Sequence, residues 1–256
     1  MLIVVMLFIC NFAPMNIVVS PSNIPSFNLA AEEYLFTRKG EDYFFLYRNA
    51  PSVIIGSNQA VMNEVDQDWC IEHEIRIIRR ISGGGAVYHD HGNLNYSLLY
   101  DKSDAPLSGR FLEPVVAVLN VLSVPAEVGR RKDLWLNGKK ISGTASHVSL
   151  QRELHHGTLL YDTNLEMLQR ALNAENKRLI KKATASVPSP VTNIRSYLAE
   201  RGGDAPDTDR FLEMFAKELL VHYGGGELMP FPGDALEEIE RLRKEKYTRR
   251  SWNYRL

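Results

Sequence analysis

The residues best able to do chemistry lie in one stretch, RRISGGGAVYHD, at positions 79–90. Two arginines and a serine precede three consecutive glycines, and a histidine and an aspartate follow them. Because glycine has no Cβ, a ligand can closely approach the backbone N–H groups of such a run. Successive exposed amides form an anion-binding concavity, and arginine adds charge-assisted hydrogen bonds. The stretch therefore predicts a pocket for a phosphate or a carboxylate.

The simplest alternative is a flexible glycine turn between two strands. Such a turn would not need Arg79, Arg80, His89 and Asp90 around it. P-loop and Rossmann sites are disfavoured as well. No Lys-Ser or Lys-Thr pair follows at the Walker A spacing, and the residue that would complete G-x-G-x-x-G is Tyr88.

A second candidate is the lysine pair in the stretch DLWLNGKKISGTA, at positions 133–145. The Asn-Gly dipeptide before the lysines is a strong signal for a tight hairpin, so the lysines open a returning strand. Side chains alternate along a strand, so Lys139 and Lys140 should point to opposite faces. Such a pair usually lies on the solvent-exposed surface without a function. Gly143, however, would let a ligand approach the backbone closely.

These two stretches carry a family resemblance. The pattern RxSGGGAVYHDxGNxN at 80–95 closely resembles the signature of the lipoate–protein ligase A family, and 133–145 resembles that family's second motif. The similarity covers about residues 16–256 and is to the form without a C-terminal accessory domain. It implies an α+β fold, with a mixed, largely antiparallel sheet flanked by helices. This is the biotin/lipoate protein ligase fold, which is like that of class II aminoacyl-tRNA synthetases.

The resemblance also implies an AMP-forming reaction in two halves. Lipoate carboxylate attacks the α-phosphate of ATP, giving lipoyl-adenylate and pyrophosphate, and an acceptor lysine then takes the lipoyl group as an amide. The family's essential lysine corresponds to Lys140. As a fixed cation, Lys140 would bind the carboxylate and the α-phosphate and stabilise the negative charge that develops there. It is not expected to be a covalent nucleophile.

The resemblance implies a set of contacts to the two substrates. The expected ATP- and lipoate-binding residues are Arg80, Ser82, Gly83, Gly84, Gly85, Ala86, Val87, Tyr88, His89, Asn95, Lys140, Ala145, His156, Gly157 and Thr158. The amides of Gly85, Ala86 and Val87 would hold phosphate, and Arg80 the nucleotide or the lipoyl carbonyl. Mg²⁺ would accompany ATP, with Asp133 as the candidate ligand. No tightly bound prosthetic group is expected.

The partners implied by the resemblance are apo lipoyl domains. These belong to the acyltransferase subunits of 2-oxoacid dehydrogenases and to the glycine-cleavage carrier protein. A formal net charge of −1 gives no reason to expect a nucleic-acid or membrane partner. Two cysteines in 256 residues do not make a disulfide framework, so a reducing cytoplasm is expected.

The N-terminal residues 1–15 stand apart from the catalytic domain expected over 16–256. Their first ten residues, MLIVVMLFIC, are strongly apolar but too few to span a bilayer as a helix. A mis-assigned start is the first hypothesis, because the sequence from Met15 resembles the usual family beginning. A first strand and a cleaved signal or membrane anchor are the alternatives, and a basic n-region is lacking.

Periodicity and turn signals place further elements around the motifs. Strands are expected at 17–19, 43–48, 53–55, 75–78, 94–100, 133–137, 139–149 and 152–161. Helices are expected at 66–73, 110–122 and 235–247, and with starts at Pro25, Asn164 and Asp207 or Thr208. The three glycines at 224–226 are expected to stop the helix before them.

Several other functions remain open from the sequence. Octanoyl transferases and lipoyl amidotransferases resemble these ligases but use a cysteine nucleophile, and no cysteine follows Lys140. A lipoyltransferase using preformed lipoyl-adenylate, or needing a separate accessory-domain protein, is a closer alternative. The chain departs from the family at Lys132, beside the expected metal ligand, where the family more often has asparagine, and at Pro190, where it more often has arginine. A non-enzymatic lipoyl-binding regulator and a biotin ligase are more remote.

Four histidines also raise the possibility of a zinc site: His89, His147, His155 and His156. No H-E-x-x-H motif and no paired cysteines accompany them, so a structural zinc is disfavoured.

Overall fold

The computed structural model describes residues 15–174, 183–231 and 233–255. The hypotheses on the apolar N-terminus therefore lie almost wholly outside the described residues. No helix in the described ranges is long and apolar enough to cross a membrane.

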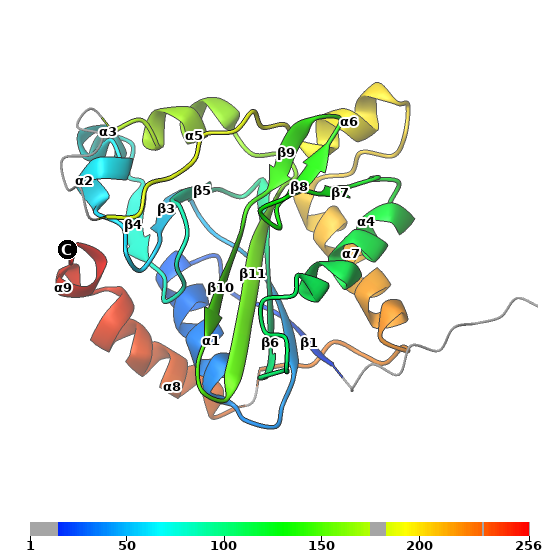
Figure 1. Cartoon of the computed structure of the whole chain (residues 1–256), viewed down its shortest axis with the longest axis horizontal. Helices are drawn as coiled ribbons and strands as arrows, with labels where there is room; N and C mark the ends of the chain where they lie inside the picture. Colours follow the sequence, from blue (N-terminus) through cyan, green and yellow to red (C-terminus); the bar gives the residue numbers. More distant parts are fainter. Residues whose placement is uncertain (1–14, 175–182, 232, 256) are drawn as a thin grey trace, which may run out of the picture.

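A five-stranded sheet forms the centre of the molecule (Figure 1). Its order is β1-β2-β6-β11-β10, and the bounds are Asn16–Val19, Tyr43–Arg48, Asn93–Asp101, Arg152–Leu160 and Thr144–Val148. Only the edge pair β1–β2 is parallel, and the other three pairings are antiparallel. The expected mixed, largely antiparallel sheet is confirmed.

Helices cover both faces of this sheet, which explains the continuous apolar run of β2. Phe44 and Leu46 pack toward α4 (Glu113–Val121) and α7 (Thr208–His222). Phe45 and Tyr47 pack toward α1 (Pro25–Thr37) and α8 (Ala235–Leu242) on the other face. Successive strand residues point to opposite faces. A strand that is buried on both faces therefore has apolar side chains along most of its length.

Two small sheets adjoin the central one. The first has the order β4-β3-β5, with bounds Arg76–Arg79, Ser52–Ile55 and Val87–His89. The second has the order β7-β8-β9, with bounds Glu127–Val128, Leu134–Leu136 and Lys139–Ser142. The short helices α2 (Val61–Glu64), α3 (Gln67–Glu72), α5 (Leu165–Ala171), α6 (Ile194–Glu200) and α9 (Arg250–Asn253) complete the described elements, with 3₁₀ and π turns at Arg110–Leu112 and Arg243–Tyr247.

Side-chain caps fix three of the expected helix starts. Asp66, Asn164 and Asp207 each accept a hydrogen bond from a backbone N–H three residues on. Such caps satisfy donors that the first helical turn leaves free. The positions expected from sequence are confirmed at all three.

Two elements that were expected to be continuous are interrupted in the structure. The strand expected at 139–149 divides at Gly143 into β9 and β10, which belong to different sheets. Gly143 accepts from the Thr158 N–H, after which β10 pairs with β11, so the chain changes partner at this residue. The helix expected at 235–247 ends at Leu242 and continues as a π turn.

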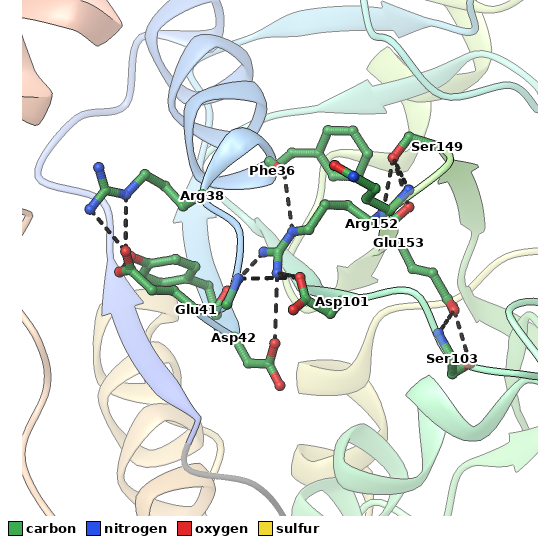
Figure 2. A network of polar contacts seen from close by, with 12 residues as sticks. Phe36, Arg38, Glu41, Asp42, Asp101, Ser103, Ser149, Arg152 and Glu153 are labelled. Carbon is green, nitrogen blue, oxygen red and sulfur yellow. Dashed lines mark hydrogen bonds and ion pairs between the residues drawn. The ribbon is translucent and has the colours of Figure 1, made fainter.

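A buried arginine, Arg152, joins the start of β11 to the end of α1 (Figure 2). Its guanidinium donates to the carboxylate of Asp101 at 2.8 Å, and to the carbonyls of Glu41 at 2.8 Å and Phe36 at 3.3 Å. A buried charge is tolerated only when it is partnered in this way. These bonds hold β11, which contributes several site residues, in a fixed position against α1.

Candidate active site

A cavity of about 310 Å³ lies between the glycine loop and the strands β9, β10 and β11. Most of its wall comes from four parts of the chain: the loop with β5, the β9–β10 junction, the middle of β11, and residues 184–187. The expected site residues in its wall are Arg80, Gly84, Gly85, Ala86, Val87, His89, Asp133, Lys140, Ala145, His156, Gly157 and Thr158. Apolar wall residues are Leu29, Tyr47 and Ile54.

Four expected ligand contacts lie outside the cavity wall: Ser82, Gly83, Tyr88 and Asn95. Tyr88 alternates with Val87 and His89 on β5, so its ring packs in the core behind that strand. The Asn95 amide donates to the carbonyl of Tyr47 and supports the wall from behind. The expectation that these four residues contact a ligand directly stays a prediction.

The two arginines before the glycine loop have different positions from those expected. Arg79 is fully buried away from the cavity, where it donates to the carbonyls of Gly56, Gln59 and Arg255 among others. It ties the C-terminal residues to the loop after β3, and its expected role toward an anion is wrong.

Arg80 lines the cavity, but most of its N–H groups are hydrogen-bonded to the glycine loop itself. Its guanidinium donates to the carbonyls of Gly83 at 2.6 Å, Gly85 at 2.8 Å and Ile54 at 3.0 Å. Burial lowers the pKa of Arg80 to about 10, which still leaves it charged at neutral pH. Arg80 therefore sets the shape of the glycine loop, whose Gly84 has φ +84°.

The glycine loop is covered by a segment that the motif did not single out. Ser186 Oγ accepts a hydrogen bond of 2.9 Å from the Ala86 amide, and its own amide donates to the Glu64 carboxylate at 3.1 Å. Gln59 also donates to Ser186 Oγ, at 3.2 Å. An amide expected to hold phosphate is therefore occupied by a serine hydroxyl in this structure.

Lys140 and Asp133 form an ion pair in the cavity wall. Lys140 Nζ lies 3.3 Å from Asp133 Oδ2, with the two side chains 21% and 4% exposed. Burial alone would raise the pKa of Asp133, but a hydrogen bond from Trp135 and the charge of Lys140 hold it below its ordinary value. Lys139 is exposed and does not line the cavity, so the expected opposite orientation of the two lysines is confirmed.

The backbone of Lys140 is also held from outside β9. Its N–H donates to the Pro190 carbonyl at 2.8 Å, and its carbonyl accepts from Thr192 at 3.1 Å. Lys132 directly precedes Asp133 in the sequence. It has φ +58°, a left-handed conformation that asparagine adopts more readily than lysine. The departure from the family pattern at 190 thus adjoins the Lys140 backbone, and the departure at 132 directly precedes Asp133, the ion-pair partner of Lys140.

A buried chain of hydrogen bonds supports the wall at His156. Its Nδ1 lies 2.8 Å from Glu32 Oε1, and its Nε2 lies 2.7 Å from Ser82 Oγ, which accepts from Arg80. The order Ser–His–Glu matches that of a hydrolase triad. However, Ser82 is fully buried and outside the cavity wall, so the arrangement positions His156 and does not present a nucleophile. Glu32 was missed by the sequence reasoning.

Metal ligands are few in this region. Among the described residues, no group of three or more His, Cys, Asp or Glu side chains could hold a metal ion. Asp133 is the carboxylate in the described part of the cavity wall. One carboxylate suits a Mg²⁺ ion that arrives with substrate phosphates, because Mg²⁺ keeps most of its ligands from water and phosphate.

Comparison with known proteins identifies the family. Residues 24–220 match the model of the lipoyl protein ligase A/B catalytic domain. The chain belongs to this family. It is 37% identical over 244 residues to lipoate–protein ligase 1 of Staphylococcus aureus, covering 92% of this chain and 72% of that protein. It is 36% identical over 242 residues to lipoate-protein ligase LplJ of Bacillus subtilis, covering 91% and 71%.

Solved structures share the fold of this lipoyl ligase family member. A lipoate-protein ligase A crystallised with ATP has a TM-score of 0.77 at 25% identity, covering 94% of this chain and 98% of that one. A T. acidophilum protein solved with bound lipoic acid has the same TM-score and identity, covering 94% and 99%. The expected biotin/lipoate ligase fold is confirmed.

The cysteine of the described residues does not suit the thioester alternative. Cys70 lies in α3, is fully buried and is outside the cavity wall. Burial raises the pKa of its thiol to about 12, so a nucleophilic thiolate is disfavoured there.

Proposed function

We propose that this chain activates lipoate with ATP and transfers the lipoyl group to a lysine of a lipoyl domain. The observation that carries the proposal is the cavity in which Lys140, paired with Asp133, and the glycine loop share a wall with the apolar side chains of Leu29, Tyr47 and Ile54. One cavity thus offers a cation, exposed backbone and an apolar slot. A carboxylic acid with an apolar tail needs these features if its carboxylate is to react with a phosphate.

The activation half assigns distinct roles to the site residues. Lys140 binds the lipoate carboxylate and the α-phosphate, and it stabilises the negative charge that develops as the carboxylate oxygen bonds to phosphorus and pyrophosphate leaves. The glycine loop supplies backbone N–H groups to the same phosphate. The Ala86 amide can take part only after Ser186 Oγ gives up its hydrogen bond. Residues 184–187 therefore yield to the nucleotide.

The transfer half uses the same charges. The neutral ε-amine of the acceptor lysine attacks the lipoyl carbonyl, and an amide forms as the bond from that carbonyl to the phosphate oxygen breaks. AMP leaves with the electron pair of that bond, and the proton lost by the amine nitrogen passes to solvent. Lys140 stabilises the departing phosphate, which keeps its negative charge. Asp133 fixes Lys140 in place through the ion pair, and Mg²⁺ brought by ATP would find its one protein oxygen ligand at Asp133.

The acceptors that we propose are apo lipoyl domains of 2-oxoacid dehydrogenase acyltransferase subunits and the glycine-cleavage carrier protein. Support comes from a bi-partite T. acidophilum lipoate protein ligase solved as a system with its E2 lipoyl domain, which has a TM-score of 0.77 to this chain at 25% identity. The proposed location is the cytoplasm, where the cysteine usage of the chain fits a reducing environment.

A transferase that uses preformed lipoyl-adenylate is the second candidate. The specific observations in its favour are two departures from the family pattern: Lys132, which precedes Asp133, and Pro190, whose carbonyl accepts from the Lys140 N–H. In that case, a separate accessory-domain protein or another ligase would supply the activated acid. A non-enzymatic lipoyl-binding regulator would bind lipoate. It would transfer the lipoyl group neither from lipoate and ATP nor from lipoyl-adenylate.

The intact mass of an apo lipoyl domain separates these candidates. The domain is incubated with this protein and either lipoate plus magnesium-ATP or lipoyl-adenylate alone. A mass gain of one lipoyl group in both reactions is expected for a self-sufficient ligase. A gain only from the adenylate would identify the transferase, and no gain from either, despite lipoate binding, would favour the regulator.

A further inference from the structure

An exposed arginine in the cavity wall, Arg131, takes no part in the reaction as proposed so far. It lines the cavity, and its guanidinium donates a long hydrogen bond of 3.4 Å to Ser189 Oγ. No carboxylate in the described part of the chain forms an ion pair with Arg131, whereas Lys140 is paired with Asp133. Arg131 is therefore a cation of the wall that an anionic ligand can still bind.

A tight turn between β7 and β8 holds the backbone of Arg131. The Lys132 amide donates to the Gly129 carbonyl at 3.0 Å, and the Gly129 amide donates to the Asp133 carbonyl at 2.8 Å. The Lys132 carbonyl accepts from Thr144 Oγ1 at 2.6 Å, which ties the turn to β10. A Cβ at Gly129 would collide with the Asp133 carboxylate, so the turn packs directly against that group. Arg131 therefore extends from a fixed backbone beside the ion pair.

Burial divides the cavity wall into a floor and an opening. The floor contains the apolar side chains of Leu29, Tyr47 and Ile54, which are all buried. The exposed residues of the wall come from the glycine loop, the turn before β8 and the segment that covers the loop: Gly84, Arg131, Thr184, Ala185 and Val187. Exposed wall residues mark the side on which the cavity meets solvent. Arg131 therefore lies at the opening.

The direction in which pyrophosphate leaves follows from this division. In the proposed reaction, the apolar tail of the acid lies at the floor and its carboxylate lies at Lys140. The attacking oxygen and the leaving oxygen of a phosphorus displacement are roughly in line, on opposite sides of the phosphorus atom. Since the acid approaches the α-phosphorus from the floor, the β- and γ-phosphates of ATP point toward the opening.

The other lysine and arginine side chains of the described wall are already engaged. The Arg80 guanidinium donates to Ser82 Oγ and to three backbone carbonyls. Lys140 is paired with Asp133 and is assigned to the carboxylate and the α-phosphate. The fork of N–H donors on an arginine matches the geometry of phosphate oxygens. Arg131 is thus the cation of this wall that suits the β- and γ-phosphates.

We propose that Arg131 is a catalytic residue of the activation half, which binds the β- and γ-phosphates of ATP and stabilises the leaving pyrophosphate. The carboxylate oxygen bonds to the α-phosphorus, the bond from that phosphorus to the bridging oxygen breaks, and pyrophosphate leaves with the electron pair. Arg131 offsets the negative charge that builds up on pyrophosphate. This inference rests on the proposed function and deepens it, because it names a group that contacts ATP but finds no ligand atom in lipoyl-adenylate.

Arg130 provides a matched control, because it is the neighbouring arginine, is exposed and lies outside the cavity wall. Calorimetric Kd values for ATP and AMP are measured with the whole wild-type chain, Arg131→Ala and Arg130→Ala at fixed salt. Loss of a charge-assisted contact to phosphate should weaken ATP binding about 10-fold in Arg131→Ala. AMP has no β- or γ-phosphate, so its Kd should stay near the wild-type value. Arg130→Ala should match wild type for both nucleotides.

A pyrophosphate-release assay of adenylate formation adds the kinetic test. In Arg131→Ala, kcat/KM for ATP should fall at least about 10-fold, while KM for lipoate stays near the wild-type value. Equal ATP affinities of Arg131→Ala and Arg130→Ala, or equal weakening of ATP and AMP binding, would overturn the inference while leaving lipoate activation intact. If wild type bound neither nucleotide and formed no adenylate, the proposed function and this inference would both fall.

Discussion

Replacement of Glu32 tests whether the buried chain behind the cavity holds the site in place. Glu32 is 1% exposed, and its carboxylate accepts from His156 Nδ1 and Ser97 Oγ. Burial alone would raise the pKa of Glu32, but His156, Ser97 and Arg80 together hold it below its ordinary value. The carboxylate is therefore ionised in the native protein and is bound through charge-assisted hydrogen bonds.

The expected loss differs between two variants. Glu32→Ala removes one partner of a buried ionic cluster and leaves His156 and Ser97 unpaired, which costs about 3–5 kcal/mol of unfolding free energy. Glu32→Gln keeps the volume and one acceptor, and the change from charged to neutral hydrogen bonds costs about 1–2 kcal/mol. For a domain of this size, the alanine variant should melt about 10 °C below wild type.

Urea unfolding of the whole chain measures both losses, and calorimetry with lipoate reports the state of the cavity. The matched control is Glu213→Gln, whose ion pair with Arg210 is 64% exposed on both sides and should contribute about 0.5 kcal/mol or less. The reasoning would be refuted if Glu32→Ala unfolded within 1 kcal/mol of wild type, or if the control cost as much as Glu32→Gln.

Two further predictions concern the glycine loop and pH. A Cβ at Gly85 would lie 2.9 Å from Ser186 Oγ and 3.2 Å from its Cα, whereas a Cβ at Gly83 meets nothing within 4 Å. Gly85→Ala should therefore lower the free energy of unfolding by about 1–3 kcal/mol in urea, and equal stabilities of Gly83→Ala and Gly85→Ala would contradict the placement of Ser186. Burial lowers the pKa of His89 from its ordinary 6.5 to about 3. The unfolded chain then takes up this proton below pH 6.5 and the native protein does not, so His89 contributes stability that is fully present above pH 6.5 and is lost as the pH falls toward 3. The loss of unfolding free energy is on the order of 4 kcal/mol by proton linkage. It should be absent in His89→Phe, and parallel stability–pH curves for wild type and His89→Phe would refute this prediction.

Local sequence signals predicted those parts of the fold that local physics decides. Asp66, Asn164 and Asp207 cap helices through bonds that span three residues, so the sequence around each contains the whole interaction. The hairpin at Asn137-Gly138 forms because both residues adopt positive φ, at 49° and 72°. Such features need no knowledge of distant segments.

The residues that sequence reasoning misplaced depend on distant partners. Glu32 reads as an ordinary helix residue because its partners His156 and Ser97 are 124 and 65 residues away. The two arginines, Arg79 and Arg80, read alike in sequence. Alternation at the end of β4 sends one toward the C-terminal residues and the other into the glycine loop. Glu32 is buried on α1 together with Ser26 and Asn28, a burial that only the structure shows.

The central claim is that Lys140, and not its neighbour, carries the charge chemistry of lipoate activation. The direct test is lipoate-dependent exchange of label between pyrophosphate and ATP in wild type, Lys139→Ala and Lys140→Ala. Lys140 lies in the cavity and pairs with Asp133, while Lys139 is exposed outside it. We predict exchange near the wild-type rate for Lys139→Ala and a loss of at least about 100-fold for Lys140→Ala. Substantial exchange by Lys140→Ala, or equal losses in both variants, would contradict the account.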